Sequence, residues 1–325
     1  MAGLWVLGEV TADGTLARIS TEVATFARTL AEAAGQEVAG IVVAADPTAA
    51  ATELATYLPR VLALSEPAAA ERAWSMVAAE RIAGILEPDT QEFMFAGAGP
   101  DGRDLAGALS AMLGWGVLAN ALGATWTDGG PVVEMSVFGG KLKTTSRFTG
   151  PKGIVTVRPN VVTAAPAAKH GEVEVVQATG DLRQPVVRTV ERVVEAGAAL
   201  PIEEAKIIVA GGRGVGGPDG FKLIEEIAEA LGGAVGATRA AVDSGWIPYG
   251  QQIGQTGKIV KPQLYLALGI SGAIQHKVGM QTAETIVAVN RDPDAPIADF
   301  ADLVVIGDLF EVGPAVLAEL RARSG

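Results

Sequence analysis

A buried strand that passes directly into a glycine-rich turn constrains this chain more than any other feature. The apolar run at residues 207–210 leads into residues 211–217, where five of the seven residues are glycine. A helix is expected over residues 219–231, with Asp219 as its cap and Gly232 after its end. Its apolar stripe recurs at helical spacing, at Phe221, Ile224, Ile227, Ala228 and Leu231. Backbone N–H groups in such a turn can approach a phosphate, so the sequence predicts an α/β domain with an anion site at the turn.

Three further loops in the same half of the chain have compositions suited to binding a ligand. They are rich in Gly, Ser, Thr and Gln, and they span residues 236–239, 252–258 and 269–276. Further strands are expected at residues 264–268, 285–289 and 303–306, and a last helix at 309–321. A plain structural domain does not need so many loops of this kind, so we expect them to serve a binding site.

The first part of the chain alternates strands with helices, which predicts βαβ units and a parallel sheet. We expect its strands at residues 4–7, 38–44, 61–64 and 92–96. We expect its helices at residues 21–34, 48–58, 73–86 and 101–113. The pattern then changes, because two strand-like runs at 131–138 and 141–148 flank Gly139 and Gly140, and a strand at 153–158 follows. Two glycines in that position predict an antiparallel hairpin.

The length of 325 residues allows two domains. The valine-rich stretch 175–194 is interpreted as the extended end of the first domain, and residues 196–204 as the linker. The expected domains are residues 1–195, which we expect to contact a partner, and residues 196–325. The predicted fold class is therefore α/β, with an N-terminal α/β sheet that has antiparallel additions and a C-terminal doubly wound parallel sheet.

Composition excludes several classes of function. The net charge of −12 disfavours non-specific nucleic-acid binding, which needs a basic surface. The absence of cysteine excludes disulfides, thiolate catalysis and thiolate-bound metals, and two histidines make a histidine-rich metal site unlikely to form. No apolar run reaches the length of a membrane span, and the first residues do not resemble a signal peptide. We therefore expect a cytoplasmic protein without a metal site.

Two familiar nucleotide motifs fit the glycine loops poorly. Residues 212–217 match GxGxxG after a strand, but the acidic residue that a nicotinamide site places after the second strand is absent around residues 234–239. Gly257 and Lys258 end like a P-loop, but Gln252 stands where glycine is required and Ile259 where Ser or Thr is required. A purely structural turn and a phosphate- or flavin-contacting loop of another design both stay open for residues 211–217.

Several polar residues after strands also have two interpretations. Arg239 is either a solvated surface charge or a planar cation that stacks on an aromatic ring system. His276, a lone histidine, is more often a structural residue than a ligand. Asn290 is a common turn residue before Asp292, and Asp308 can cap the last helix.

Four sequence motifs of the second half together resemble the alpha subunit of electron transfer flavoprotein. The motifs are VAGGRG at residues 209–214, GATRAAVD at 236–243, QIGQTGK at 252–258 and GISGAIQH at 269–276. IVAVN at 286–290 and GDLF at 307–310 extend the resemblance almost to the end of the chain. Over residues 1–195 the resemblance lies mainly in the layout, supported by GRDL at 102–105 and TVRP at 156–159.

The resemblance implies one FAD, held mainly by the second domain, and a heterodimer with a beta subunit. It implies an electron carrier that accepts electrons from flavin dehydrogenases and passes them to a membrane quinone oxidoreductase, as in fatty acid oxidation, and that is not an enzyme by itself. It places Arg239 at the isoalloxazine, Thr256 at N5 and His276 near the C2 carbonyl. The full set of residues that it implies for FAD is Arg213, Thr238, Arg239, Ile253, Gly254, Gln255, Thr256, Ser271, Gly272, Ala273, Ile274, Gln275, His276, Asn290, Asp308 and Leu309. A flavin-bifurcating complex and a non-redox module for adenine nucleotides are the alternatives.

Overall fold

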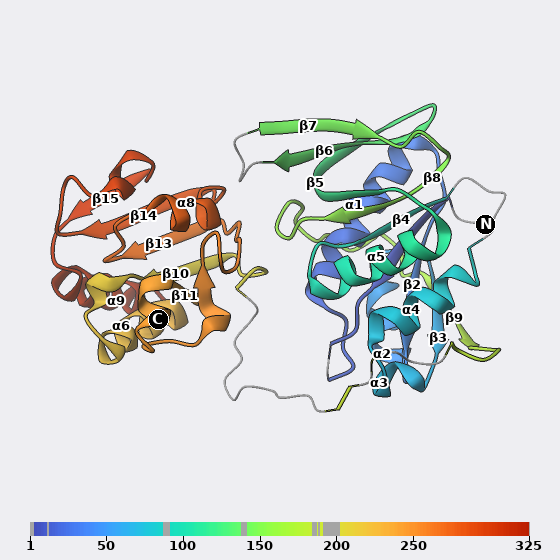
Figure 1. Ribbon diagram of the computed structural model, residues 1–325, viewed down its shortest axis with the longest axis horizontal. Helices are drawn as coiled ribbons and strands as arrows, with labels where there is room; N and C mark the ends of the chain where they lie inside the picture. Colours follow the sequence, from blue (N-terminus) through green and yellow to red (C-terminus); the bar gives the residue numbers. More distant parts are fainter. Residues whose placement is uncertain are drawn as a thin grey trace. The chain divides into compact units, whose positions relative to one another are not determined.

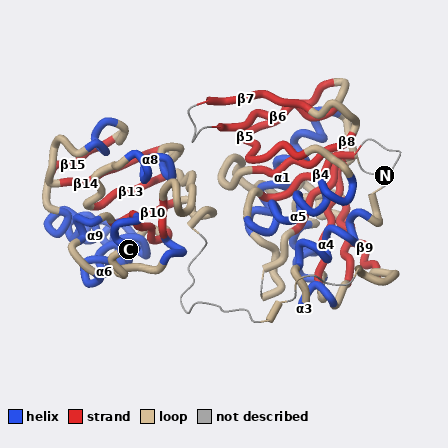
Figure 2. The backbone as a smooth tube through the Cα atoms, in the orientation of Figure 1, coloured by secondary structure: helices blue, strands red, loops and turns tan. Residues whose placement is uncertain are grey.

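The computed structural model describes residues 3–11, 13–86, 92–137, 142–183, 187, 189–190 and 202–324. The described residues fall into two compact units, one before residue 191 and one from residue 202 on (Figure 1). The predicted boundary at 195/196 lies outside the described residues, as do most of the predicted linker and the glycines of the hairpin turn. Each unit contains one sheet, drawn in red in Figure 2, with helices in blue along it.

The sheet of the N-terminal unit is mostly parallel and has an antiparallel extension at one side. Its strand order is β7-β6-β5-β8-β4-β1-β2-β3-β9. The pairs β5–β6 and β6–β7 are antiparallel, and every other pair is parallel. The strands are β1 (Leu4–Gly8), β2 (Val38–Ala44), β3 (Arg60–Ser65), β4 (Glu92–Gly97), β5 (Val117–Thr127), β6 (Gly130–Val137), β7 (Leu142–Arg147), β8 (Lys152–Val157) and β9 (Glu172–Gln177). The predicted α/β sheet with antiparallel additions is confirmed.

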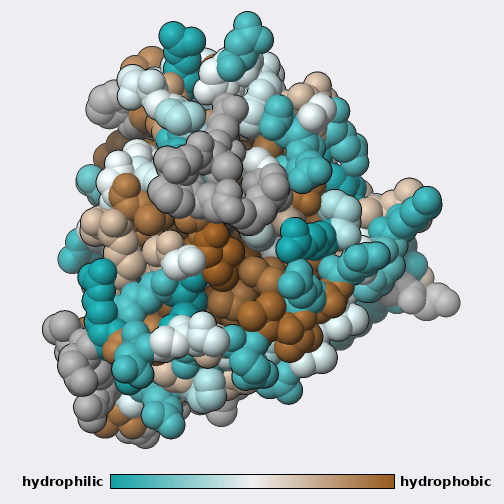
Figure 3. Space-filling model, turned by 90° about the vertical axis from the view of Figure 1, so that its right-hand side faces the viewer, coloured by the Kyte–Doolittle hydropathy of each residue, from teal (hydrophilic) through white to brown (hydrophobic). Residues whose placement is uncertain are grey.

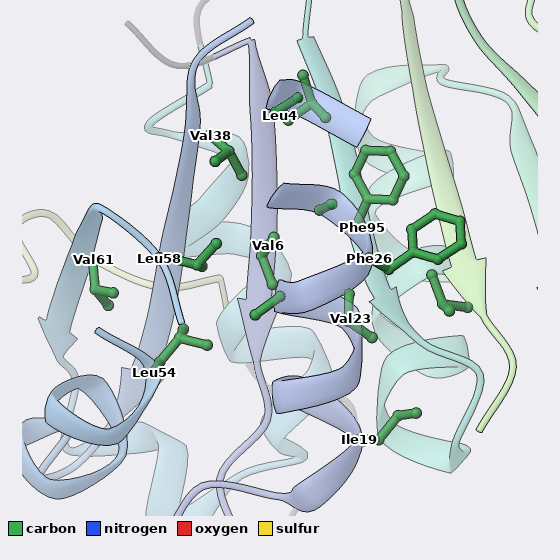
Figure 4. Packing of buried hydrophobic residues seen from close by; sticks show 14 of the residues in the cluster. Leu4, Val6, Ile19, Val23, Phe26, Val38, Leu54, Leu58, Val61 and Phe95 are labelled. Atoms are coloured by element: carbon green, nitrogen blue, oxygen red, sulfur yellow. The ribbon is translucent and has the colours of Figure 1, made fainter. Parts of the chain in front are cut away.

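Helices cover both faces of this sheet because its central strands are apolar on both sides. The helices are α1 (Arg18–Ala34), α2 (Thr48–Leu54), α3 (Ala68–Glu71), α4 (Trp74–Ala83) and α5 (Pro100–Leu113). On β1, Leu4 and Val6 pack with α1 and α2, as Figure 4 shows, whereas Trp5 and Leu7 pack with α4 and α5. Alternate residues of one strand therefore feed two cores, which is the arrangement that continuous hydrophobic strands predict.

Two strands of this sheet were not predicted as such. Strand β5 contains Asn120 with a φ of 60°, and its register with β6 shifts between Ala121 and Gly123. A bulged strand with this composition lacks the period-two alternation that identifies strands in a sequence. Strand β9 pairs in parallel with β3, so the stretch interpreted only as extended begins as a sheet edge.

The C-terminal unit is built on a parallel sheet with the order β12-β11-β10-β13-β14-β15. Its strands are β10 (Ile207–Gly211), β11 (Ala234–Thr238), β12 (Gln252–Ile253), β13 (Leu264–Leu268), β14 (Thr285–Asn290) and β15 (Leu303–Ile306). Its helices are η1 (Arg213–Val215), α6 (Pro218–Ala230), α7 (Arg239–Asp243), η2 (Tyr249–Gln251), α8 (Ile274–Met280), η3 (Pro296–Asp299) and α9 (Leu309–Ser324). The predicted doubly wound parallel sheet is confirmed.

The apolar stripe predicted for α6 faces the sheet, with Phe221, Ile224, Ile227 and Ala228 buried. The predicted cap was wrong, because α6 begins at Pro218 and no side chain caps it. The Asp219 carboxylate instead accepts a hydrogen bond from Lys222 Nζ at 2.8 Å. That bond lowers the pKa of Asp219 and stabilises the first turn from the solvent side. Among the described helices, none combines the length and the apolar character needed to cross a membrane.

Candidate functional site

The predicted loops lie at the carboxyl edge of the C-terminal sheet. All six strands run in parallel, so every loop that follows a strand emerges at the same edge. The chain passes from β10 to β11 on one side and later to β13 on the other side of β10. The direction of winding reverses between β10 and β13, and open α/β sheets bind ligands at such a switch point. The loops 212–217 and 269–273 flank that point.

Glycines bring these two loops into direct backbone contact. The Gly212 N–H donates to Leu268 O and the Gly214 N–H donates to Gly269 O, both at 3.0 Å. A Cβ on Gly212 would lie 2.4 Å from Gly269 O, and one on Gly214 would lie 2.8 Å from Gly269 Cα. Side chains at these positions would therefore push the loops apart. Arg213, between the two glycines, is exposed at the edge.

The loop after β13 leaves a row of backbone donors open. Gly272 has a φ of +84°, and a Cβ there would lie 2.4 Å from Ile297 N. Ile297 N–H donates to Ser271 O at 3.0 Å and holds this turn against η3. The N–H groups of residues 271–275 have no acceptor among the described residues. Ser271, Ala273, Ile274 and Gln275 are exposed, so these donors are available to a ligand.

The loop after β12 is closed on itself and presents two polar residues at its tip. Gln255 N–H donates to Gln275 O at 2.7 Å, which ties the tip to α8. The Thr256 carbonyl accepts from the Tyr249 hydroxyl at 2.8 Å, and the Thr256 hydroxyl contacts Gln252 Nε2 at 3.2 Å. Both Gln255 and Thr256 are exposed. The loop therefore holds its polar tip rigidly toward solvent.

Thr238 and Arg239 stand where β11 ends and α7 begins. The Thr238 hydroxyl is buried and has no hydrogen-bond partner among the described residues. A buried hydroxyl without a partner costs stability, and a ligand that hydrogen-bonds to it removes that cost. Arg239 is 67% exposed, and its Nε bonds to Asp243 Oδ2 at 3.1 Å one turn further along α7. Its guanidinium is accessible from solvent, as a stacking role requires.

His276 is the predicted site residue that differs most from the others. Its side chain is buried, with Nε2 2.9 Å from the Tyr265 hydroxyl and Nδ1 3.0 Å from Ile253 O. A carbonyl only accepts, so Nδ1 carries the proton and Nε2 accepts from Tyr265. Burial lowers the pKa of His276 to about 4, so the ring is neutral at pH 7. In this arrangement His276 joins α8 to β12 and β13, which agrees with the structural interpretation.

The residues after β14 and β15 support the edge from its far side. Asn290 Nδ2 donates to Ile270 O at 2.9 Å, and its Oδ1 accepts from Asp292 N at 3.0 Å. Asp308 Oδ1 accepts from Phe310 N at 2.8 Å, so this carboxylate caps α9. Leu309 is buried and meets the loop at Gly269. These side chains shape the loop after β13 from behind.

Three residues of this site escaped sequence reasoning, namely Tyr249, Gln252 and Tyr265. All three act through side-chain hydrogen bonds to loop residues. Tyr265 lies in an apolar strand, where its sequence context predicts only burial. Gln252 belongs to the predicted loop 252–258, but the sequence assigns no role to its side chain. No sequence signal distinguishes a tyrosine or glutamine that positions a loop from one that fills space.

The site suits a long anionic cofactor and offers nothing for a metal. Open N–H groups at residues 271–275 and the cations Arg213 and Arg239 are donors for phosphate or ring oxygens. The unpartnered Thr238 hydroxyl adds a buried donor or acceptor. Within the described parts of the chain, no three His, Asp or Glu side chains gather as metal ligands. A flavin nucleotide, which combines a diphosphate with polar rings, fits this set of donors.

A second hollow lies in the N-terminal unit and contains none of the predicted residues. Figure 3 shows hydrophobic side chains gathered around a hollow on one face of the molecule. A cavity of about 630 Å³ in this unit is lined by the ends of α4 and α5 and by the segment before β8, including Leu86, Trp115 and Phe148. Lys152 Nζ lies 5.4 Å from the Trp115 ring centroid at its rim.

The fold and the site define a class of protein, an α/β protein that binds a nucleotide cofactor at the switch point of a doubly wound sheet. Residues 201–281 match the family model described as electron transfer flavoprotein FAD-binding domain. Residues 4–181 match the model described as electron transfer flavoprotein domain. The chain therefore belongs to the alpha-subunit family of electron transfer flavoproteins, and its cofactor is FAD.

Full-length relatives agree with this assignment. The chain is 40% identical to the electron transfer flavoprotein subunit alpha of Mycobacterium leprae (strain TN), over 100% of both chains. It is 41% identical to that of Mycobacterium tuberculosis (strain ATCC 25618 / H37Rv), again over 100% of both chains. It is 36% identical to that of Bacillus subtilis (strain 168), over 97% of this chain and 96% of the relative. The resemblance predicted from sequence motifs is thereby confirmed.

Proposed function

We propose that this chain is the FAD-holding half of a heterodimeric electron carrier. In this role it accepts electrons from flavin dehydrogenases, passes them to a quinone-linked acceptor and does not act as an enzyme by itself. The observation that supports it best is the edge made by the loops 212–217, 253–257 and 269–275, with open N–H groups beside glycine contacts. Such an edge can bind and orient a cofactor. It offers no nucleophile and no general base, and electron transfer through a flavin requires neither of them.

Bound FAD supplies the electron-transfer chemistry, and the residues of the edge hold and tune it. The N–H groups of residues 271–275, with Arg213, are the donors we assign to the anionic part of FAD. The buried Thr238 hydroxyl gains its missing partner when the cofactor is bound. With FAD bound, the Arg239 guanidinium would offset negative charge on the ring system, and the exposed Thr256 hydroxyl would be the donor to ring nitrogen N5 that the family resemblance implies.

His276 differs from the other proposed FAD residues, because both of its ring nitrogens already have partners within the protein. Its expected contact with the flavin C2 carbonyl stays a prediction, and it requires Nε2 to release the Tyr265 hydroxyl and to carry a proton, because a carbonyl oxygen only accepts. Through Ile253 O the same ring already fixes the start of the loop that carries Gln255 and Thr256. We therefore assign His276 first to positioning that loop.

A beta subunit is the partner we propose, as the family implies. The test is co-expression of the chain with that subunit, followed by the visible spectrum and by counting flavins per heterodimer. One FAD per heterodimer and reduction by a flavin dehydrogenase are the expected results. A colourless complex that binds an adenine nucleotide would favour the non-redox module instead. A second flavin, together with splitting of electron pairs between two acceptors, would favour a bifurcating complex.

A monomer that binds FAD as tightly alone as in the co-expressed pair would contradict the need for a partner. This result would leave FAD binding intact and remove only the heterodimer from the proposal. The co-expressed pair therefore tests FAD binding, and the chain expressed alone tests the need for the beta subunit.

A further inference from the structure

Lys258 is the residue of the glycine loops that the proposed function leaves unused. It follows Gly257, where a P-loop lysine would bind a phosphate, but the rest of that motif is missing. In the structure Lys258 Nζ lies 2.5 Å from Glu203 Oε1. The two side chains are 36% and 24% exposed, so this ion pair is less screened than pairs on the open surface. The Lys258 ammonium group is therefore paired with the Glu203 carboxylate.

The backbone of Lys258 closes the loop whose tip carries Gln255 and Thr256. Lys258 N–H donates to Gln252 O at 2.7 Å, and Lys258 O accepts from Gly254 N at 3.1 Å. The residue therefore ends the loop with two backbone bonds and sends its side chain away from it to Glu203. A displacement of Lys258 moves both bonds, and with them the position of the loop tip.

Glu203 is itself held in place. It lies between Ile202 and Ala205, which are 5% and 3% exposed and belong to the same core as Ile253 and Val260. The backbone that carries Glu203 is thus anchored to the core at the point where the described chain enters the C-terminal unit. Because the backbone on both sides of the ion pair is anchored, a change in one side chain is transmitted to the segment that carries the other, at the cost of rotamer freedom in two long side chains.

We infer that Lys258 and Glu203 are positioning residues that clamp the 253–257 loop in the conformation that receives FAD. This inference rests on the proposed contact between that loop and the flavin. It differs from a phosphate-binding role for Lys258, because the two roles predict opposite effects of removing Glu203. A clamp fails when either partner is lost, whereas a phosphate-binding lysine binds an anion better once its carboxylate neighbour is neutral.

The experiment uses the full-length chain co-expressed with its beta subunit. Glu203→Gln and Lys258→Met are each expected to raise the dissociation constant of FAD about two- to fivefold, the fold-change that corresponds to the upper part of the energies typical of single ion pairs. Both are expected to change the visible circular dichroism of FAD at full occupancy and to speed amide exchange at Gln255. The charge swap Glu203→Lys with Lys258→Glu is expected to restore the dissociation constant to within about twofold of the original.

Control variants separate a local effect from a general loss of stability. Glu226→Gln removes a pair with Arg321 of 3.1 Å that joins α6 to α9, away from the loop. This control is expected to leave the flavin signals unchanged. Lys258→Arg keeps the charge and provides a conservative variant if the swap does not fold, and it is expected to bind FAD within about threefold of the original.

Three results would overturn the inference. One is tighter or unchanged FAD binding in Glu203→Gln beside weaker binding in Lys258→Met, which makes Lys258 a phosphate ligand. Another is unchanged affinity and dichroism in both single variants. The third is an unaltered flavin spectrum in Thr256→Val, which removes the loop from the flavin and contradicts the proposed function as well. A changed spectrum in Thr256→Val with unaffected pair variants overturns the clamp alone.

Discussion

The buried His276 makes the stability of the C-terminal unit depend on pH in a calculable way. Burial lowers its pKa in the folded state to about 4, from 6.5 in the ordinary case. As the pH falls through 6.5, the unfolded chain takes up a proton that the folded chain does not. Stability from this group is therefore complete above about pH 6.5 and is lost progressively between 6.5 and 4.

The magnitude follows from the difference between the two pKa values. At about 1.36 kcal/mol per pKa unit, the full effect is at most about 3.4 kcal/mol. Between pH 7 and pH 5 the same linkage removes about 2 kcal/mol. This loss is a large fraction of the stability of an ordinary domain, about 5–15 kcal/mol, so it is measurable by denaturant unfolding.

The measurement compares the chain with His276→Gln, which does not titrate, at pH 7, 6 and 5. The variant is less stable at pH 7 because the Tyr265 hydroxyl and Ile253 O lose their partner. Between pH 7 and pH 5, however, the variant is expected to lose about 2 kcal/mol less of its free energy of unfolding than the original chain. Histidine NMR gives the pKa directly, since the only other histidine is His170, which is exposed. An ordinary titration of His276 near 6.5, or equal pH dependence in both proteins, would refute the reasoning.

Three shorter predictions concern the edge. Gly272→Ala is expected to lower stability more than Gly216→Ala, because both glycines have positive φ, +84° and +81°, but only the first would clash with Ile297; the shared strain costs about 1–2 kcal/mol, and equal losses in urea unfolding would contradict the clash. Arg239→Ala is expected to lower the first one-electron potential of bound FAD by about 50 mV, a modest shift because Asp243 and solvent screen the charge. Spectroelectrochemical titration measures this potential, and an unchanged value would show that Arg239 does not lie at the flavin ring. Denaturation in acid is expected to release free FAD, since the chain has no cysteine for a thioether link; flavin retained by the precipitated chain would show a covalent bond.

The strands of both sheets were predictable where the two faces of a strand are uniformly buried. Residues 38–44 and 264–268 were predicted with the bounds that the structure has, because these apolar runs are too short for ordinary helices and have Gly or Pro beside them. Strand β5 failed this test because Asn120 and the register shift before Gly123 interrupt its alternation. The partner strand β8 decides its conformation, and a single sequence does not reveal that pairing.

The candidate site likewise has one part that the sequence predicts, the loops, and one part that it does not predict, the directions of the side chains. Glycine turns after strands have strong sequence signals, so the loops around Gly212, Gly254 and Gly272 were found. The direction of a side chain has no such signal. Nothing in the sequence distinguishes an exposed Arg239, ready for a ligand, from a His276 whose ring nitrogens are both bonded inside the protein. These outcomes depend on contacts with residues distant in the chain, such as Tyr265 and Ile253.

Glycines let main-chain atoms of neighbouring segments at the edge come into direct contact, at Gly212 with Leu268, Gly214 with Gly269 and Gly272 with Ile297. The exposed side chains of Gln255 and Thr256 take no part in those contacts. The Thr256 hydroxyl accepts a hydrogen bond from Gln252 Nε2 within its own loop. The glycine contacts that bring the loops together are therefore made by other atoms than the side chains of Arg239 and Thr256, which we assign to tuning the flavin. Under the proposed function, an exposed side chain such as that of Arg239 is therefore a position where the redox properties of the carrier can change while the glycine contacts between the loops stay intact.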